Sequence, residues 1–367
     1  MVAEGRPKQL GALRARMPFG RIAVGVAVPA IAIALALALG AVIVIVAGDS
    51  PLDAYGALVH GAVGTPSNIA ATFIRSTPIA ITGLGVAIAF KGGAFNLGGE
   101  GQMIAGALVG AVAANALPAL PAPLGTLLAI AAGCLAGALW AFGPALLEIR
   151  LGVPMLITTL LLNYVAALLA AWVVTYPLRD LAGGGVAQTA MVPEATWLPA
   201  IGATRLNAGV VLLAVLPFIA AWALRRTVAG YELRMVGANR EFAEYGGVDA
   251  ARSIVGATLV SGALCGLAGV VLVLGVNHRY IDGLVTSAGF AWSGFIAAVL
   301  ALASPILTVV AGVFLGALQV GGLGMTRATS VPLQLVDIVQ AAIILVVAVR
   351  AGIQAALLKR AGGRGGA

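Results

Sequence analysis

The chain has 367 residues, of which 61% are hydrophobic and 9% are charged, and its formal net charge is +8. Soluble domains carry about 25% charged residues, so this composition excludes a soluble body and predicts a polytopic membrane protein. The positive charge is not a nucleic-acid signal, because the basic residues lie in short loops and near the chain ends, where they orient membrane proteins.

A basic arm, residues 1–21, precedes the first apolar run at 22–47. This run is too long for the apolar core of a cleaved signal peptide, which has about 7–15 residues, so we interpret it as an uncleaved span. Nine more apolar runs follow, and they suit a hydrocarbon core about 30 Å thick. We therefore predict an all-α polytopic membrane protein with about ten transmembrane helices. The predicted spans are 22–47, 69–90, 95–115, 124–147, 153–176, 208–225, 254–276, 286–302, 305–322 and 334–350.

The distribution of lysine and arginine predicts how these spans are oriented. With the N-terminus inside, the internal segments carry sixteen of these residues and the external segments carry four, in agreement with the positive-inside rule. We expect a single transmembrane domain over 22–350. The arm 1–21 and a basic tail, 351–367, are both expected in the cytoplasm.

Two loops between the predicted spans are long enough to hold structure of their own. The external loop 177–207 contains three consecutive glycines, three prolines and Trp197, a content typical of short structure at the membrane–water interface. The internal loop 226–253 mixes charges of both signs with apolar residues at helical spacing. This pattern predicts one or two short amphipathic helices on the cytoplasmic face.

The segment 92–106 places Asn96, Glu100 and Gln102 among glycines, between two apolar runs. A bare carboxylate at membrane depth costs roughly 2.5–3.5 kcal/mol on insertion scales, and lipid cannot satisfy the polar groups of an irregular backbone. Such a segment has to line a cavity or pack against protein. We therefore expect it to form part of a permeation path.

The motifs of several enzyme classes are absent from the sequence. No G-x-x-x-x-G-K-[ST] loop contains any of the three lysines, so the chain carries no P-loop ATPase site of its own. Paired carboxylates, an H-E-x-x-H motif and cysteine–histidine ligand spacings are also missing. We expect no catalytic residue, no metal site and no cofactor bound by this chain.

The sequence from Phe95 to Met103 resembles the F-N-[IL]-G-x-E-G-Q signature of ABC importer permeases of the nucleoside and simple-sugar group, a branched-chain amino acid/ribose permease-like family. Three further stretches are similar to motifs of this family. Leu162–Tyr164 resembles M-L-N-Y, Gly230–Asp249 resembles a cytoplasmic G-x-x-[LF]-R-x-V-G-x-N motif, and Ser261–Gly269 resembles S-G-A-L-A-G-L-A-G. The resemblance covers most of residues 50–350.

The chain departs from the family pattern at two places. Gly152–Ile157 stands where the family usually has a glutamate followed by Val-Ile, and Gly289–Phe295 differs from the usual G-x-G-F-x-x-[IL]-A. In the second stretch, Trp292 adds bulk beside the expected path. Both departures bear on which solute is carried.

The resemblance implies a fold like that of the cobalamin-type (type II) importers and a place in the bacterial cytoplasmic membrane. Such permeases move nucleosides or simple sugars inward and pair with a second permease, here expected to be a homologue. They bind two cytoplasmic ABC ATPase subunits, which hold ATP and Mg, and receive solute from an external substrate-binding lipoprotein. The chain would then be a transporter subunit in the lipid bilayer, without enzymatic activity and without a nucleic-acid partner.

The residues expected to act fall into two groups. Residues at membrane depth are candidates for the translocation path, with interhelical hydrogen bonding or core packing as the alternative role; for Glu100, the alternative is to cap a broken helix near Lys91. The path candidates are Arg75, Phe95, Asn96, Glu100, Gln102, Asn163 and Trp292. Residues of the internal loop are candidates for ATPase coupling, with a solvated surface helix as the alternative. The coupling candidates are Tyr231, Glu232, Arg234, Gly237, Asn239, Glu244, Tyr245 and Gly247.

Two other functions are weighed against the importer. An ion-coupled secondary transporter of nucleosides would use Glu100 or Arg75 as its coupling site, but carboxylates are sparse in the predicted spans. A non-transporting scaffold or enzyme subunit would need no polar, glycine-rich segment at membrane depth. The sequence therefore favours the ATP-driven importer.

Overall fold

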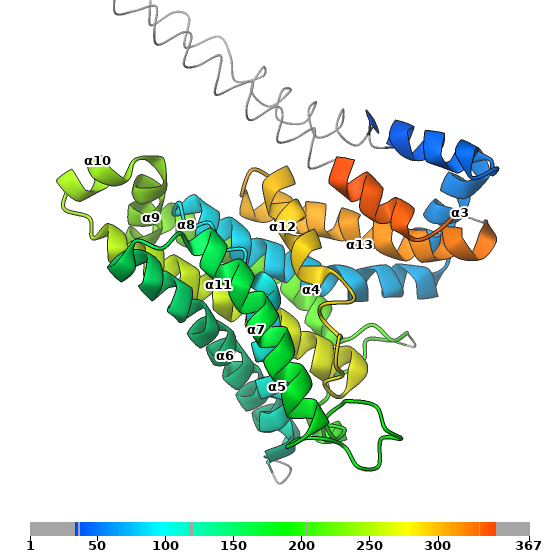
Figure 1. The fold of residues 1–367 in the computed structure, drawn as a ribbon, viewed down its shortest axis with the longest axis horizontal. Helices are drawn as coiled ribbons and strands as arrows, with labels where there is room; N and C mark the ends of the chain where they lie inside the picture. Colours follow the sequence, from blue (N-terminus) through cyan, green and yellow to red (C-terminus); the bar gives the residue numbers. More distant parts are fainter. Residues whose placement is uncertain (1–33, 36, 117–119, 203, 330, 343–367) are drawn as a thin grey trace, which may run out of the picture.

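The computed structural model describes residues 34–35, 37–116, 120–202, 204–329 and 331–342, so the predicted arm 1–21 and tail 351–367 lie outside the described residues. Within them, helices make up the regular structure apart from two isolated β-bridges (Figure 1). The α-helices with named bounds are α3 (Pro51–Val63), α4 (Pro66–Lys91), α5 (Gly99–Ala116), α6 (Ala122–Leu151), α7 (Met155–Thr175), α8 (Val211–Arg226), α9 (Val228–Ala238), α10 (Arg240–Tyr245), α11 (Ala250–Leu272), α12 (Phe290–Leu300) and α13 (Pro305–Ala328). Short 3₁₀ helices, η1 (Glu194–Thr196) and η2 (Ala208–Val210), precede α8, and a π-helical turn, η3 (Val273–Asn277), extends α11.

Six helical segments of the described chain are long and apolar enough to cross a membrane. They are Pro66–Lys91, Pro123–Leu151, Met155–Thr175, Ala208–Arg226, Ala250–Asn277 and Pro305–Ala328. A seventh is added if Leu37–Val46 and Pro51–Val63, which are bent by 119° at their break, form one span. The prediction of membrane-spanning helices is thus confirmed, whereas the number ten stays a prediction.

The predicted eighth span, 286–302, differs most from the structure. Only Phe290–Leu300 is helical there, and 11 residues at about 1.5 Å each cannot cross a hydrocarbon core of about 30 Å. Positive φ angles at Gly289, Leu302 and Ala303 flank this helix, so the chain turns sharply at both of its ends. The sequence showed an unbroken apolar run, which does not reveal these turns.

The N-terminal region also contains a helix that the apolar runs did not predict. Helix α3 starts at Pro51 after the N-cap Ser50, whose side chain accepts a hydrogen bond from Asp53 N–H. Of the first predicted span, 22–33 lies outside the described residues, as does 343–350 of the last one; in both cases the remainder is mostly helical. Predicted external residues after position 50 therefore fold as a helix.

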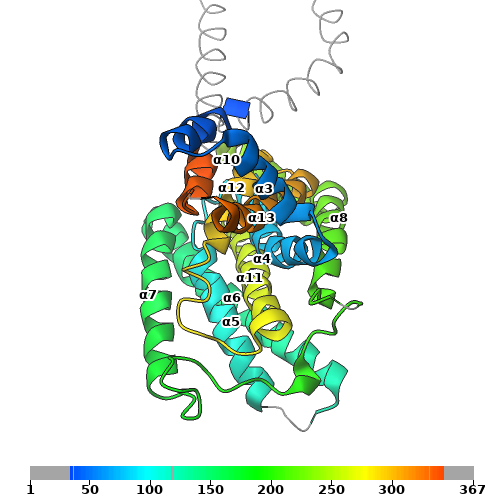
Figure 2. The same cartoon turned by 90° about the vertical axis from the view of Figure 1, so that its right-hand side faces the viewer.

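Helices α4 and α11 form the centre of the bundle. Helix α11 packs against α4, α5 and α6, while α4 also packs against α12 and α13. Of the most apolar stretch of α4, 78% is buried, compared with 28% for α6 and 33% for α7. Figure 2 shows α7 and α8 on opposite sides of the bundle, with α11 between them. The outer helices therefore offer their apolar side chains to lipid or to another protein.

Glycines bring α5, α6 and α11 into backbone contact. A Cβ atom added to Gly106 of α5 would lie 2.3 Å from the Cα of Gly266 in α11. A Cβ added to Gly137 of α6 would lie 2.2 Å from the carbonyl oxygen of Gly262. Small residues at such positions allow close helix approach in membranes, where packing drives association. No side-chain layer therefore separates these three helices at these points.

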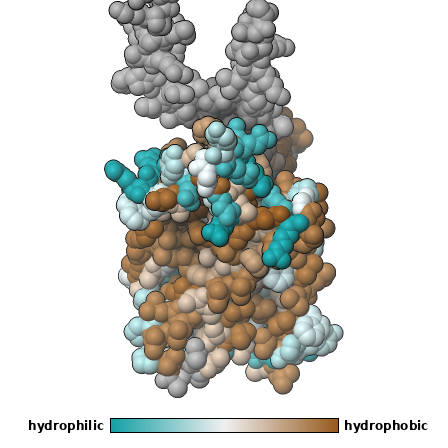
Figure 3. Space-filling view, turned by 90° about the vertical axis from the view of Figure 1, so that its left-hand side faces the viewer, coloured by the Kyte–Doolittle hydropathy of each residue, from teal (hydrophilic) through white to brown (hydrophobic). Residues whose placement is uncertain are grey.

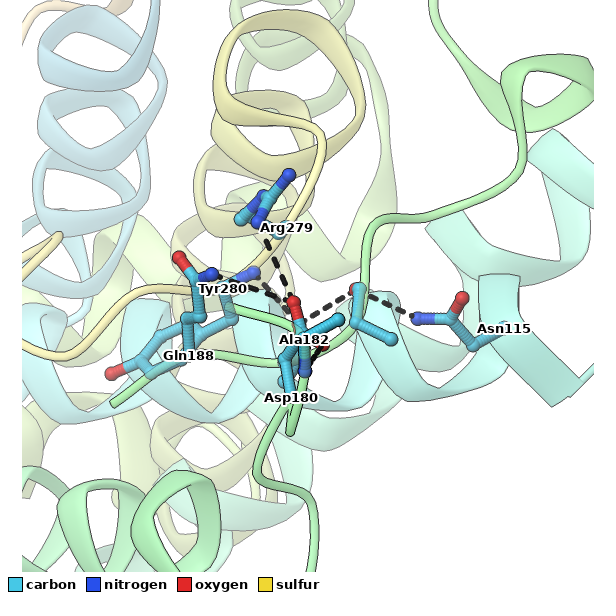
Figure 4. Close-up of polar contacts among 8 residues, drawn as sticks. Asn115, Asp180, Ala182, Gln188, Arg279 and Tyr280 are labelled. Carbon is cyan, nitrogen blue, oxygen red and sulfur yellow. Dashed lines mark hydrogen bonds and ion pairs between the residues drawn. The ribbon is translucent and has the colours of Figure 1, made fainter. Parts of the chain in front are cut away.

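The loop 177–207, which was predicted to be external, is held down on the segment that follows η3 (Figure 4). Asp180 Oδ2 lies 3.7 Å from Arg279 Nη1, and the Tyr280 N–H donates to Thr189 Oγ1 at 3.0 Å. Asn115, near the end of α5, donates to the Ala190 carbonyl at 3.3 Å. The loop thus holds short structure of its own, namely η1 and these contacts.

The opposite end of the molecule carries α9 and α10, the amphipathic helices predicted for the loop 226–253. Thr227 caps α9 by accepting from Gly230 N–H at 3.1 Å, and Asn239 caps α10 by accepting from Phe242 N–H at 3.0 Å. Figure 3 shows hydrophilic side chains gathered at this end, above a belt of hydrophobic surface. This distribution is the one expected of a bilayer-embedded protein.

Substitution of Gly106 by alanine should separate α5 from α11, because the new methyl group would meet backbone rather than a movable side chain. We expect a loss of about 1–3 kcal/mol in stability, measured as a lower Tm of the purified protein in detergent. Gly143→Ala in α6 is the matched control, since nothing lies within 4 Å of its added Cβ and alanine favours a helix over glycine by about 1 kcal/mol. Equal Tm values for the two variants would contradict the packing argument.

Candidate functional site

The chain between α4 and α5 is irregular, and side chains from α7 satisfy its backbone. Leu97 N–H donates to Thr159 Oγ1 at 3.2 Å, and the Leu97 carbonyl accepts from Asn163 Nδ2 at 3.0 Å. Asn163 Oδ1 also accepts from Gly101 N–H, in the first turn of α5, at 2.8 Å. These bonds supply partners that lipid cannot offer to an irregular backbone.

Asn96 is a fully buried hydrogen-bonding centre within this irregular segment. Its Nδ2 donates to Gln102 Oε1 at 3.2 Å and to Ser261 Oγ of α11 at 3.1 Å. Its Oδ1 accepts from Gln102 Nε2 and Gly98 N–H, both at 2.9 Å. Asn96 and Gln102 therefore bond to this chain itself in the structure, which is the interhelical alternative weighed from the sequence.

The other side of the segment presents aromatic side chains at the protein surface. Phe95 is 59% exposed and Trp292 of α12 is 46% exposed. The rings form a chain: the Phe90 centroid lies 5.3 Å from that of Phe95 and 5.9 Å from that of Phe295, which lies 6.1 Å from that of Trp292. We call Phe90, Phe95, Trp292 and Phe295 the aromatic face.

Glu100 lies at the edge of the aromatic face, in the first turn of α5. It is half-buried, and it lines a small pocket together with Trp292. Lys91 does not neutralise it: the Lys91 ammonium donates to the Leu302 carbonyl at 3.3 Å, and the three ion pairs found among the described residues do not involve Glu100. A carboxylate in this position needs water or protein over it, because lipid cannot solvate it.

The structure brings six of the seven path candidates together and places the seventh, Arg75, elsewhere. Arg75 Nε donates to Gln319 Oε1 at 2.7 Å and its Nη2 donates to the Ala288 carbonyl at 3.2 Å. Its guanidinium carbon lies 4.5 Å from the centroid of the Phe290 ring. Arg75 lines a cavity of about 920 Å³ that also borders α3 and α13, near the N-terminal half of α4.

A neighbouring cavity of about 1160 Å³ lies beneath the external loop. Trp197 and His278 line it and stack on each other, with ring centroids 3.7 Å apart. Burial lowers the pKa of His278 below its ordinary value, so the imidazole is neutral at pH 7 and suits a stack on an indole ring. The two cavities share Ile74, Arg205 and Val276 in their walls.

Sequence reasoning missed several partners of these residues. Thr159 precedes Asn163 by four positions, so both lie on one face of α7, and that spacing could have predicted a shared role. Ser261 stands at the start of the small-residue run that the resemblance already identified. Gln319 carries no such signal, because it is 244 positions from the arginine that it contacts.

Helices α9 and α10 expose aromatic side chains at their end of the molecule. Tyr231 is 55% exposed, Tyr245 is 93% exposed, and Phe242, which was not predicted, is 64% exposed. Arg234 and Glu244 are exposed and Glu232 is half-buried; Glu244 pairs with Arg240 at 2.9 Å. These side chains form a mixed aromatic and charged surface on α9 and α10.

Three other coupling candidates shape this segment. Asn239 caps α10, and Gly247 has a φ of 84°, which only glycine adopts readily. A Cβ added to Gly237 would lie 2.1 Å from the Lys91 carbonyl oxygen, so Gly237 lets α9 touch the end of α4. We conclude that these residues fix the position and form of the short helices.

A hydrophobic cluster connects α9 and α10 to the irregular segment. Val236 of α9 and Ala243 of α10 are buried together with Ala94, which lies two residues before Asn96. Met155 of α7 and Ile254 of α11 belong to the same cluster. A displacement of α9 or α10 would therefore act directly on the chain that carries Asn96 and Glu100.

Known proteins are similar to this chain over most of its length. The family model for the branched-chain amino acid transport system permease component matches residues 68–348. The guanosine ABC transporter permease protein NupP of Bacillus subtilis is 34% identical over 311 residues, covering 84% of this chain and 88% of that protein. The nucleoside ABC transporter permease protein NupB of Lactococcus lactis is 31% identical over 327 residues, covering 87% and 89%.

A third relative carries a different solute in its name. The glucose ABC transporter permease protein TsgB13 of Haloferax volcanii is 32% identical over 308 residues, which is 80% of each chain. No solved structure gives a significant match to this chain. The similarity therefore extends across the irregular segment, the aromatic face and the short helices described above.

Replacing Asn163 by leucine, which is similar in size, should destabilise the protein. The Gly101 N–H and the Leu97 carbonyl would lose their partners, and each unsatisfied buried group costs about 1–3 kcal/mol. We expect a clearly lower Tm in detergent. Tyr164→Leu, at the adjacent and 73% exposed position of α7, should leave the Tm nearly unchanged. An Asn163→Leu protein as stable as the original would mean that the irregular segment does not depend on this amide.

Proposed function

The chain belongs to the family of branched-chain amino acid transport system permease components, and we propose that it is the permease subunit of an ATP-driven importer of nucleosides or simple sugars. Three relatives named as ABC transporter permeases for guanosine, nucleosides and glucose support this substrate class. The chain itself carries no P-loop. The energy of ATP hydrolysis, with ATP and Mg, thus comes from two separate ATPase subunits.

The single observation that carries the proposal is Glu100 beside the aromatic face. A half-buried carboxylate without a cationic partner among the described residues, next to exposed Phe95 and Trp292, is unsuited to lipid. We propose that a second, homologous permease covers this face and that the solute passes between the two subunits. Asn96, Gln102 and Asn163 hold the irregular segment in place, and Glu100, Phe95 and Trp292 meet the solute.

The short helices α9 and α10 are the proposed contact with an ATPase subunit. Their exposed aromatic and charged side chains provide the surface, and the buried cluster around Ala94 provides the mechanical connection to Asn96 and Glu100. Closure of the ATPase pair would move these helices as a rigid body. The aromatic face would then open and close towards the solute without chemistry in this chain.

The orientation follows from the distribution of basic residues. We propose a multi-pass protein of the bacterial cytoplasmic membrane with both termini in the cytoplasm, since sixteen lysines and arginines fall in the internal segments and four in the external ones. The external loop and the two adjoining cavities would then face a substrate-binding lipoprotein. Beyond the six long apolar helices, ten spans in a type II arrangement would need α5, the predicted spans 22–47 and 334–350, and the whole stretch 286–302 around the short helix α12.

Uptake of labelled nucleosides and sugars tests the function directly. Cells with and without the gene are compared while the ion gradients are collapsed and ATP is maintained. We expect gene-dependent uptake that survives the collapse, with nucleosides or simple sugars as the best competitors. Uptake that disappears with the gradients would instead establish an ion-coupled secondary transporter.

The same assay tests the role of the carboxylate. Glu100→Gln keeps the size of the side chain and removes its charge, so we expect at least about tenfold slower uptake, the loss associated with a charge-assisted hydrogen bond. Asp53→Asn is the matched control and should transport normally, because this exposed carboxylate of α3 lines neither cavity. Membrane levels of both variants are measured by immunoblot; normal uptake by Glu100→Gln at equal levels would remove Glu100 from the path.

Co-purification with the ATPase subunit tests the coupling surface. Replacing Phe242 and Tyr245 by alanine removes exposed rings that are not needed for the fold, so we expect the ATPase to be lost from the purified complex while the permease stays monodisperse. Tyr164→Ala, an exposed tyrosine of α7, should retain the ATPase. Retention of the ATPase by the double variant would show that the ATPase contacts another part of the protein.

A further inference from the structure

The cavity that contains Arg75 has an unusual charge distribution. Its volume is about 920 Å³, and its walls include Arg75, Arg205, Arg327 and His60. None of its described lining residues is an aspartate or a glutamate. Three guanidinium groups thus surround a space that no carboxylate of its walls neutralises.

Arg75 is oriented by neutral groups only. Its two hydrogen bonds end on the amide oxygen of Gln319 and the carbonyl of Ala288, and the Phe290 ring packs against its guanidinium. Each contact fixes the position of the guanidinium without cancelling its charge. The positive field in the cavity is therefore retained.

The Gln319 amide is fixed in turn by a second hydrogen bond. Gln319 Nε2 donates to Ser293 Oγ of α12 at 2.8 Å, and Ser293 Oγ donates to Gln340 Oε1 at 3.2 Å. Ser293 and Gln340 are buried. These hydrogen bonds direct the amide oxygen of Gln319 towards Arg75. The guanidinium of Arg75 is therefore held in one orientation. Preorganised donors of this kind reduce the cost of binding a ligand.

We propose that this cavity is a binding site for an oxyanion, a phosphate or carboxylate group carried by a small molecule. Guanidinium groups match the geometry of such groups with paired hydrogen bonds, and the volume is within the range of small-molecule pockets, about 300–1,000 Å³. The shared wall at Arg205 connects this site with the cavity beneath the external loop. The site is separate from Glu100 and does not depend on which solute is transported.

The oxyanion has two possible sources, a soluble anion or the headgroup of an anionic lipid. The first arm of the experiment uses the purified full-length protein in a neutral detergent at low salt. Inorganic phosphate and uridine 5′-monophosphate are titrated by calorimetry, with uridine as the uncharged comparison. We expect both anions to bind and to raise the Tm, with affinity that falls as salt is added.

Arginine variants locate the site. Arg75→Gln and Arg327→Gln should each weaken anion binding at least about tenfold, as expected for the loss of a charge-assisted hydrogen bond. Arg327 is exposed in the last turn of α13, so its variant should fold even if Arg75→Gln does not. Arg179→Gln is the matched control, because this exposed residue of the external loop does not line the cavity, and its affinity should be unchanged.

The second arm uses nanodiscs of phosphatidylcholine with and without phosphatidylglycerol. Stabilisation by phosphatidylglycerol that is lost in Arg327→Gln but not in Arg179→Gln would identify the lipid headgroup as the source of the oxyanion. Absence of an effect in both arms, or equal effects in Arg327→Gln and Arg179→Gln, would overturn the proposal. Neither arm measures transport, so this result is independent of the proposed importer function.

Discussion

The hydrogen bonding of one irregular backbone segment governs the arrangement of this protein. Between α4 and α5 the chain leaves helical geometry, and backbone groups that local turns do not satisfy find partners on Thr159 and Asn163 of α7 and on Asn96 within the segment. Asn96 is tied to α11 through Ser261. Four helices are thereby fixed around one break, and the aromatic face with Glu100 is a consequence of that arrangement.

Hydropathy predicted the long helices that correspond to long apolar runs. The bounds of α4, α6 and α7 lie within a few residues of the predicted spans, because long apolar runs have no other stable form in a membrane. The same signal failed for α12 and α3. An apolar run does not reveal the left-handed residues Gly289, Leu302 and Ala303 that flank α12. It also does not reveal that α3, which begins at Pro51 after a serine cap, is bent by 119° from the helix before it.

The sequence predicted which residues belong to the candidate site. It did not predict how their roles differ. Asn96, Glu100 and Gln102 stand within seven positions of one another, yet the two amides are directed into the protein while Glu100 lies beside exposed Trp292. Helical phase cannot predict this division, because Asn96 precedes the helix. Arg75 illustrates the opposite case, since its neighbours Gln319 and Ala288 come from distant parts of the chain.

The backbone contact between α5, α6 and α11 has a consequence for movement. Side chains can change rotamer and let helices slide, but where Gly106 meets Gly266 and Gly137 meets Gly262 there is no side chain to rearrange. Helices α5, α6 and α11 should therefore move together as one rigid body. Helix α12 is joined to α4 in the same way, because a Cβ added to Gly294 would lie 2.8 Å from the Gly83 nitrogen, so conformational change should appear as movement of packed helices together rather than as a general loosening of the bundle.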